Sequence, residues 1–282
     1  MVTKIIACAD IHVPSLKGVD ELKEHMKKFI KKCAKVVKDE GGPEHVRIVC
    51  AGDIFHNKIA ITNESILCAN WFFSELDKIC KTIVFCGNHD FLMNNKDRVD
   101  SLSPLFEIGS YNNVVFIDKE LGFKSGILHD DNINWCLYSS FADFNTPDIE
   151  PHKVSNKNAE EEIYVGLIHG DVNGAITVTN YVADHGIDPA VFDGCDFVIA
   201  GHIHKRQEIK KNGVRIVYCS SLKQQNFGES VSGHGYVLWD VEDKDDITYK
   251  YVDIKDSDGG FYKFTINSID DIDNDNEELI NY

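Results

Sequence analysis

Five short polar segments of this chain each follow directly after an apolar run. They are Asp10-Ile11-His12, Gly52-Asp53, Gly87-Asn88-His89-Asp90, His169-Gly170 and Gly201-His202-Ile203-His204. In an open α/β sheet, the loops at the carboxyl ends of parallel strands meet at one edge. We therefore expect side chains from all five segments to lie close together, which constrains the fold more than any other feature of the sequence.

The spacing of apolar residues predicts strands that alternate with helices in the first half of the chain. The expected strands are 4–9, 47–51 and 82–86, with one helix capped by Asp20 and a second that begins at Thr62 or Asn63 and runs to about Ile79. In the second half we expect single strands over 163–168 and 197–200, then antiparallel pairs of 206–211 with 214–219 across Asn212-Gly213, and of 235–241 with 247–254. This order predicts an α/β fold of two packed sheets flanked by helices.

The polar segments together supply three aspartates, one asparagine and five histidines. Oxygen and nitrogen donors of this kind suit a pair of divalent cations. We expect the first cation to be bound by Asp10, His12, Asp53 and His204, and the second by Asp53, Asn88, His169 and His202. Water held between two dications has a lowered pKa and could attack a phosphate ester, so the set is typical of a metal-dependent phosphoesterase.

His89 is not needed as a ligand in this scheme. We expect its imidazole to protonate the leaving oxygen as a general acid, with Asp90 orienting the ring and favouring its charged form. The alternative is that these residues belong to ordinary turns and hydrogen-bonded histidines. A single motif would leave that alternative open, whereas five motifs in order, each after a strand, argue against it.

Composition limits the class of protein. With 282 residues, 43% of them apolar, the chain can bury the core of one large domain. Its nine cysteines are odd in number, form no C-x-x-C pair and lie mostly within apolar runs, so reduced thiols in a cytoplasmic setting are expected. An apolar run long enough to span a membrane and an N-terminal secretory signal are both missing from the sequence, so we expect no membrane association.

The net charge of −17 is unevenly distributed. Residues 240–282 contain 14 aspartates and glutamates against four lysines. Such a charge argues against broad electrostatic capture of nucleic acid. It does not exclude a nucleic-acid enzyme, because bound dications would add positive charge where a phosphate must lie.

The order Asp-x-His, Gly-Asp, Gly-Asn-His-Asp, His and Gly-His-x-His resembles the calcineurin-like metallophosphoesterase superfamily over about residues 1–254. The resemblance implies a four-layer α/β/β/α sandwich and a dinuclear site. Manganese is the expected metal, with magnesium, iron and zinc as alternatives. We expect a catalytic domain over 1–258, and a short strand with an acidic tail over 259–282, which could begin a truncated capping domain.

A narrower resemblance is to SbcD-type DNA repair nucleases. It is carried by the segment 52–58 (Gly-Asp-Ile-Phe-His-Asn-Lys), by Asp196–His204, by 217–222 and by Asn226-Phe227-Gly228-Glu229. The family usually has Gly-Ser where this chain has Ser220-Ser221, so the loop there is expected to differ. The resemblance implies exo- and endonuclease activity on DNA and places His56 near the site, outside the set of metal ligands.

The same resemblance implies partners. The apolar helix over 63–79 is expected to build a homodimer, with a helix buried inside the monomer as the alternative. An SMC-like ATPase of the SbcC type is a further expected partner, although the sequence ends before the helices that bind it in the family. Lys205 and Arg206 are expected to hold flanking phosphates of DNA, with solvated surface cations as the alternative. Two other functions stay open, a small-molecule or protein phosphoesterase and a non-catalytic scaffold on the same fold.

Overall fold

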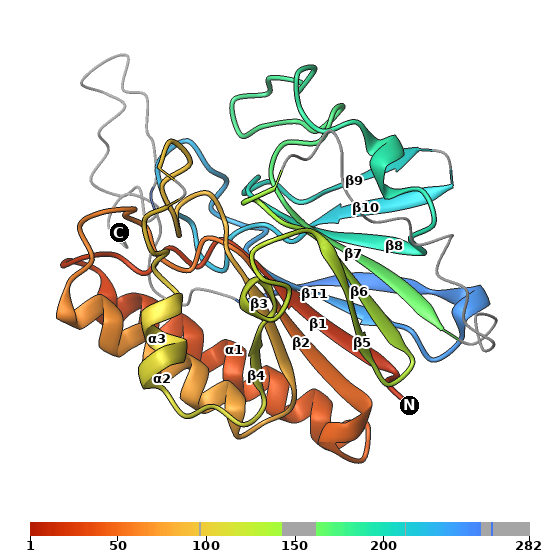
Figure 1. Cartoon of the computed structure of the whole chain (residues 1–282), viewed down its shortest axis with the longest axis horizontal. Coiled ribbons are helices and arrows are strands. Elements are labelled where there is room, and N and C mark those ends of the chain that lie inside the picture. Colours follow the sequence, from red (N-terminus) through yellow and green to blue (C-terminus); the bar gives the residue numbers. More distant parts are fainter. Residues whose placement is uncertain (96, 143–161, 212, 255–260, 262–282) are drawn as a thin grey trace, which may run out of the picture.

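The computed structural model describes residues 1–95, 97–142, 162–211, 213–254 and 261. Two six-stranded mixed sheets pack face to face, as Figure 1 shows. The first sheet has the order β12-β11-β1-β2-β3-β4, in which β1 to β4 are parallel. Its strands are β1 (Lys4–Cys8), β2 (Val46–Ala51), β3 (Thr82–Phe85), β4 (Val114–Phe116), β11 (Gly235–Asp240) and β12 (Thr248–Asp253).

The second sheet has the order β5-β6-β7-β8-β10-β9, with parallel pairing from β6 through β10 and antiparallel strands at both edges. Its strands are β5 (Gly126–Asp130), β6 (Ile133–Tyr138), β7 (Ile163–His169), β8 (Phe197–Gly201), β9 (Gln207–Lys211) and β10 (Val214–Tyr218). The expected strands and antiparallel pairs are confirmed, while Asn212 of the expected turn lies outside the described residues. The sequence analysis did not anticipate β4, β5 and β6.

Helices flank the sheets. On the outer face of the first sheet lie α1 (Val19–Asp39), α2 (Asn63–Asp77) and the short α3 (Ser103–Ile108), all visible in Figure 1. Short helical turns are η1 (Pro43–His45), α4 (Ile117–Glu120), η3 (Pro189–Phe192) and η4 (Lys244–Asp246). On the outer face of the second sheet, the described residues contribute η3, whose Phe192 is fully buried against Tyr138 and Val198. The expected α/β fold of two mixed sheets flanked by helices is confirmed.

The helix starts show how local sequence and geometry combine. Thr62 caps α2 in a reciprocal capping box with Ser65. Of the two candidates for this position, Thr62 and Asn63, the first is therefore confirmed. The expected Asp20 cap is wrong, because α1 begins at Val19, two residues earlier than such a cap requires, after Gly18 in a left-handed conformation (φ 87°). Asp20 lies instead in the first turn, where its charge favours the positive end of the helix dipole.

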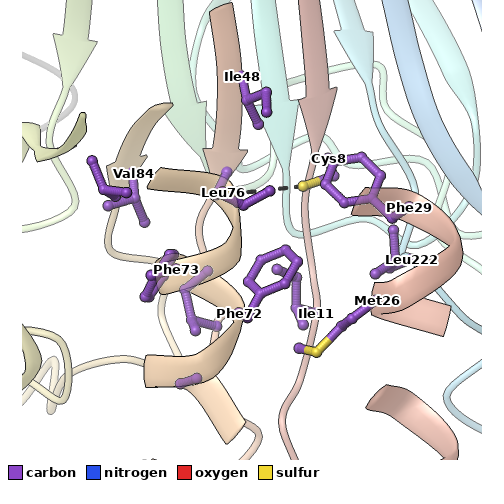
Figure 2. Close-up of a cluster of buried hydrophobic side chains, with 14 of the residues drawn as sticks. Cys8, Ile11, Met26, Phe29, Ile48, Phe72, Phe73, Leu76, Val84 and Leu222 are labelled. Atoms are coloured by element: carbon purple, nitrogen blue, oxygen red, sulfur yellow. Dashed lines mark hydrogen bonds between the residues drawn. The ribbon is translucent and has the colours of Figure 1, made fainter. Parts of the chain in front are cut away.

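The core consists of layers on both faces of the first sheet. Side chains alternate along β1, so that Ile6 and Cys8 face the helices while Ile5 and Ala7 face the second sheet. Figure 2 shows the helix side of this core, where side chains of two helices meet the sheet: Met26, Phe29, Phe72, Phe73 and Leu76 against Cys8, Ile48 and Val84. All nine cysteines are free and buried, as expected for reduced thiols.

A buried ion pair joins the two sheets at the end opposite the polar segments. The carboxylate of Asp130, at the end of β5, accepts from Arg47 Nε on β2 at 2.8 Å and from Lys81 Nζ at 2.9 Å. The Trp135 indole also donates to it at 3.2 Å. Burial by itself raises the pKa of Asp130, but the hydrogen bonds from Arg47 and Lys81 outweigh it and lower the pKa below its usual value.

We predict that Asp130→Ala lowers the free energy of unfolding by about 3–5 kcal/mol, because it leaves the Arg47 guanidinium buried without its carboxylate. Urea unfolding followed by circular dichroism measures the loss. The control is Glu107→Ala, which removes an exposed partner of Lys119 and should cost less than about 1 kcal/mol. Equal losses in the two variants would show that the Asp130 pair does not join the sheets.

Candidate metal centre

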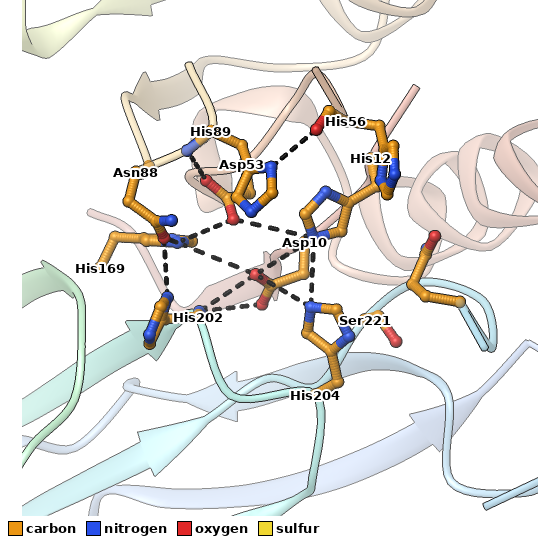
Figure 3. A network of polar contacts seen from close by, with 12 residues as sticks. Asp10, His12, Asp53, His56, Asn88, His89, His169, His202, His204 and Ser221 are labelled. Atoms are coloured by element: carbon orange, nitrogen blue, oxygen red, sulfur yellow. Dashed lines mark hydrogen bonds and ion pairs between the residues drawn. The ribbon is translucent and has the colours of Figure 1, made fainter. Parts of the chain in front are cut away.

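The five polar segments meet at one end of the two sheets, as the sequence predicts. Asp10 and His12 follow β1, Asp53 follows β2, and Asn88 and His89 follow β3 of the first sheet. From the second sheet, His169 ends β7, while His202 and His204 follow β8. Figure 3 shows these side chains converging on a common centre. Side chains that lie far apart in the sequence therefore form one cluster between the two sheets.

Left-handed backbone brings these side chains into the cluster. Asp10, His12 and Asp53 have φ of 52°, 51° and 53°, and His202 has φ of 94°. Such values are rare for residues with a Cβ and are found mostly where the surrounding structure enforces them. Here the first two loops hold each other, because Asp10 N donates to Gly52 O at 3.1 Å and His12 N donates to Asp53 O at 3.0 Å.

A glycine in the third motif permits the close approach of the second. A Cβ on Gly87 would lie 2.2 Å from Asp53 Oδ1 and 2.3 Å from its backbone nitrogen. Any side chain there would displace the Asp53 carboxylate. The Gly-Asn-His-Asp motif thus needs its glycine for a steric reason, independently of any chemistry.

One group of ligand atoms consists of Asp10, His12 and His204. The Nε2 atoms of His12 and His204 are 3.1 Å apart and lie 4.0 and 3.6 Å from Asp10 Oδ1. The ligand atoms of these three residues all lie within 4.8 Å of one another. Two ring nitrogens aimed at the same point beside a carboxylate fit a shared cation, because they would otherwise compete for one proton.

The second group consists of Asp53, His169 and His202, with Asn88 beside them. His169 Nε2 lies 3.2 Å from Asp53 Oδ2 and 3.2 Å from Asn88 Oδ1, and His202 Nδ1 lies 2.7 Å from the same amide oxygen. Asp53 Oδ2 is also 3.7 Å from His12 Nε2, so this carboxylate lies between the two groups. The geometry therefore fits the expected bridging role of Asp53, and the donors are the oxygens and nitrogens that divalent cations prefer.

Charge is strongly coupled within the cluster. Burial by itself lowers the pKa of His169 and of His204, but the carboxylates beside them raise these pKa values to about 9 and about 10. Burial likewise raises the pKa of Asp53, yet the charge of His169 holds it below its usual value. Burial lowers the pKa of His12 to about 3, so this ring is neutral and able to bind a metal.

Outer contacts fix the orientation of the ligand histidines. His169 Nδ1 lies 2.8 Å from the Ala51 carbonyl oxygen, and His204 Nδ1 lies 2.7 Å from Glu229 Oε1. Each contact directs the opposite ring nitrogen, Nε2, into the cluster. Asp171 plays a similar part for His202, whose Nε2 lies 3.6 Å from its carboxylate. Sequence reasoning noted Glu229 only within a resembling segment and missed both roles.

The structure contradicts the expected role of Asp90. Its buried carboxylate accepts hydrogen bonds from the backbone nitrogens of Ile54, Phe55 and Gly87 at 2.9–3.1 Å. Burial and the charge of Asp53 raise the pKa of Asp90 to about 7, whereas these N–H donors favour its charged form. Asp90 thus braces the second and third loops. The His89 ring is oriented instead by the carbonyl oxygen of His56, 2.6 Å from its Nδ1.

The remaining predicted residues lie at the edge of the cluster. The His56 ring is 5.4 Å from that of His12, close to the ligands but outside both groups. Lys205 is exposed, and its Nζ donates to Asn180 Oδ1 at 3.0 Å. Arg206 forms an ion pair with Asp253 and lies 5.0 Å over the Tyr251 ring. The charge of the Arg206 guanidinium is therefore already balanced by Asp253. The sequence analysis had expected this side chain to bind phosphates of DNA.

The departure at Ser220-Ser221 has a structural explanation. Ser220 adopts a left-handed conformation with φ of 71°, which glycine adopts without strain. Its hydroxyl donates to the carbonyl oxygen of the metal-site residue His204 at 2.7 Å. The loop keeps the backbone shape that a glycine would favour, and the serine adds a hydrogen bond to it.

Comparison with known proteins identifies the family. Residues 3–206 match the calcineurin-like phosphoesterase family, and the chain belongs to it. The uncharacterized protein R555 of Acanthamoeba polyphaga mimivirus is 34% identical over 239 residues, covering 84% of this chain and 17% of that protein. "Putative phosphoesterase 244L" of invertebrate iridescent virus 6 is 29% identical over 185 residues, covering 64% of this chain and 60% of its own length. This chain thus spans less than two thirds of either relative.

A solved structure shares the fold. GAP50, the anchor in the inner membrane complex of Plasmodium, superposes with a TM-score of 0.51 at 11% identity, over 90% of this chain and 85% of that one. In the described part of this chain, no helix is both long and apolar enough to cross a membrane. The chain is thus a member of the calcineurin-like phosphoesterase family whose clustered side chains suit divalent metal ions.

We predict that Glu229→Gln weakens binding of Mn²⁺ by about 10- to 100-fold, because the His204 ring loses the carboxylate that orients it. Isothermal titration calorimetry on the metal-free protein measures the affinity. The control variant is Glu64→Gln, which neutralises an exposed carboxylate in the first turn of α2 and should bind Mn²⁺ as the wild type does. An unchanged affinity in Glu229→Gln would refute the orienting role.

Proposed function

We propose that this phosphoesterase is a manganese-dependent DNA nuclease of the SbcD type, acting in recombination or double-strand-break repair. The observation that carries the proposal is open space on both sides of the metal cluster. A pocket of about 420 Å³ adjoins His169 and His202, and another of about 360 Å³ adjoins His12 and His56. A phosphodiester has a substituent on each side of the phosphate, whereas a monoester has only one, so this layout favours a diester.

Roles for individual side chains follow from their positions. The two groups around Asp10 and Asp53 would hold two divalent cations, which when bound supply Lewis-acid activation of the phosphate and lower the pKa of water. His89 lies beside them, with its ring 4.9 Å from that of His12. Because its Nδ1 donates to the His56 carbonyl oxygen, its Nε2 is the nitrogen that can give a proton to the leaving oxygen.

We predict that His89→Ala slows cleavage of a DNA oligonucleotide by about 10²- to 10⁴-fold, because the leaving sugar oxygen loses its proton donor. Hydrolysis of bis-para-nitrophenyl phosphate should fall much less, since nitrophenolate leaves readily without a proton. Both rates are measured with Mn²⁺, and Mn²⁺ affinity is measured alongside. The control is His129→Ala, an exposed histidine on β5. Equal losses on both substrates would contradict the general-acid role.

A second function, a small-molecule or protein phosphoesterase, is favoured by the net charge of −17, which does not attract a polyanion. A panel with Mn²⁺ distinguishes the two. It compares single-stranded DNA, duplex ends, bis-para-nitrophenyl phosphate and a phosphomonoester. Cleavage of DNA supports the nuclease. Turnover of the monoester without cleavage of DNA supports the second function, and no turnover of any substrate supports a non-catalytic scaffold.

We also propose that the protein forms a homodimer through α2. The inner face of this helix is buried in the core, while Ile66 and Leu67 on its other side are exposed, Leu67 by 67%. With Val99 and Ile108 they line a largely apolar groove of about 850 Å³. Exposed apolar surface of this kind marks association sites, and the second copy is the occupant that the resemblance to SbcD-type nucleases indicates. An SMC-like ATPase remains a proposed further partner.

We predict that Leu67→Glu converts a dimer to a monomer, because it places a charge on each side of a symmetric apolar contact. Sedimentation velocity at micromolar concentration measures the state. Leu16→Glu, at an exposed leucine in the loop before α1, is the control and should leave the dimer intact. A wild-type protein that sediments as a monomer would remove the dimer hypothesis.

A further inference from the structure

An exposed aromatic ring lies in the loop that carries Glu229 and has no role assigned so far. Phe227 is 62% exposed, although it lies only two residues before Glu229, which orients the metal-site residue His204. Its ring makes an edge contact with that of Phe261, with centroids 4.9 Å apart. Phe261 in turn lines the pocket that reaches His12 and His56. The two rings therefore form an aromatic surface that continues into the metal site.

The loop that carries Phe227 is held firmly. Asn226 accepts from Gly228 N at 2.7 Å through Oδ1, and its Nδ2 donates to Glu229 Oε1 at 2.8 Å. Gln225 N donates to the other carboxylate oxygen of Glu229 at 2.8 Å. These bonds fix the backbone on both sides of the ring. Phe227 is thus exposed from a loop whose backbone is held by side-chain hydrogen bonds on both sides of the ring.

Phe261 is attached to the same loop. The side-chain amide of Gln224 accepts from Phe261 N at 2.7 Å and donates to Phe261 O at 3.0 Å. The same amide nitrogen also donates to Glu229 O at 3.0 Å. One buried glutamine therefore holds the second ring in place relative to the first.

The charges near this surface limit what could bind there. Two cations around the site are already paired with acids, Lys223 with Glu21 and Arg206 with Asp253. Lys205 donates to the neutral amide of Asn180, and the exposed Lys17 lines the same pocket as Phe261. The chain as a whole is strongly acidic. Long-range attraction of a phosphate backbone is therefore weak, and affinity for a nucleic acid must come from the metal site and from apolar contacts. Aromatic rings provide such contacts to nucleobases by stacking.

We propose that Phe227, supported by Phe261, is a stacking subsite for an unpaired nucleobase next to the scissile phosphate. A base within a duplex is covered on both faces by its neighbours, so only an unpaired base can present a face to the ring. The substrate class is accordingly single-stranded DNA or the frayed end of a duplex. This inference rests on the proposed nuclease function and adds the recognition element to it.

The experiment tests whether the Phe227 ring contacts one particular base of the substrate. The value of kcat/KM with Mn²⁺ is measured on a single-stranded oligonucleotide and on a series that carries one abasic site at each position around the cut. For the wild type, we expect one abasic position to lower kcat/KM by about 10-fold, the size of one lost stacking contact. Phe227→Ala should lower it by a similar factor on the intact oligonucleotide and by no further factor on that abasic one.

Three comparisons separate stacking from structural damage. Phe227→Trp should retain activity on the intact oligonucleotide, because the larger ring still stacks. His129→Ala, at an exposed ring on β5, should behave as the wild type. The ratio of DNA cleavage to hydrolysis of bis-para-nitrophenyl phosphate should fall in Phe227→Ala, with Mn²⁺ affinity measured to check that Glu229 stays in place.

The outcomes are distinguishable. Equal loss in Phe227→Ala on every oligonucleotide, abasic or intact, would show a merely structural role and overturn the subsite. Cleavage of DNA at the wild-type rate by Phe227→Ala would overturn the subsite while leaving the nuclease function standing. A wild-type protein that hydrolyses bis-para-nitrophenyl phosphate but cleaves no DNA would overturn both.

Discussion

The site depends on keeping two carboxylates charged where water cannot solvate them. Asp10 and Asp53 are both buried at strand ends, and an isolated buried carboxylate is very costly. The rings of His169 and His204 lie against them, and the opposed pKa shifts of acids and imidazoles express this pairing. A divalent cation would balance the charge of the same carboxylates, with neutral imidazoles as co-ligands. The residues that would bind a metal are therefore the same residues that balance charge within the fold.

Strained backbone at the site is held in place by hydrogen bonds between neighbouring loops. The left-handed residues after β1 and β2 pair with each other, and the Asp90 carboxylate joins the β2 loop to the β3 loop through three backbone nitrogens. Farther from the site, the buried pair of Arg47 and Asp130 connects the two sheets. The side chains of the site are thus positioned by hydrogen bonds and ion pairs at both ends of the sandwich.

The acidity of the chain and the proposed phosphoesterase chemistry are reconciled by where the charges lie. The acidic excess is concentrated after residue 240, and Arg206 next to the last metal motif is neutralised by Asp253 from β12. Metal ions bound at the cluster would add positive charge at the place where a phosphate must lie. Selectivity for a substrate then depends on short-range contacts around this centre, because attraction over longer distances is weak.

The sequence by itself determined which side chains meet at the candidate metal centre, because each motif directly follows a strand and parallel strands bring their carboxyl ends to one edge. It also determined α2, whose capping residues are local, and the antiparallel pairs β9–β10 and β11–β12. Only the tertiary structure decided that Asp90 braces loops, that Arg206 is paired and that Glu229 orients His204. Those roles depend on contacts between segments up to 47 residues apart and on how the two sheets are aligned. Local patterns of apolar and polar residues carry no information on that alignment, which is why β5 and β6 were also missed.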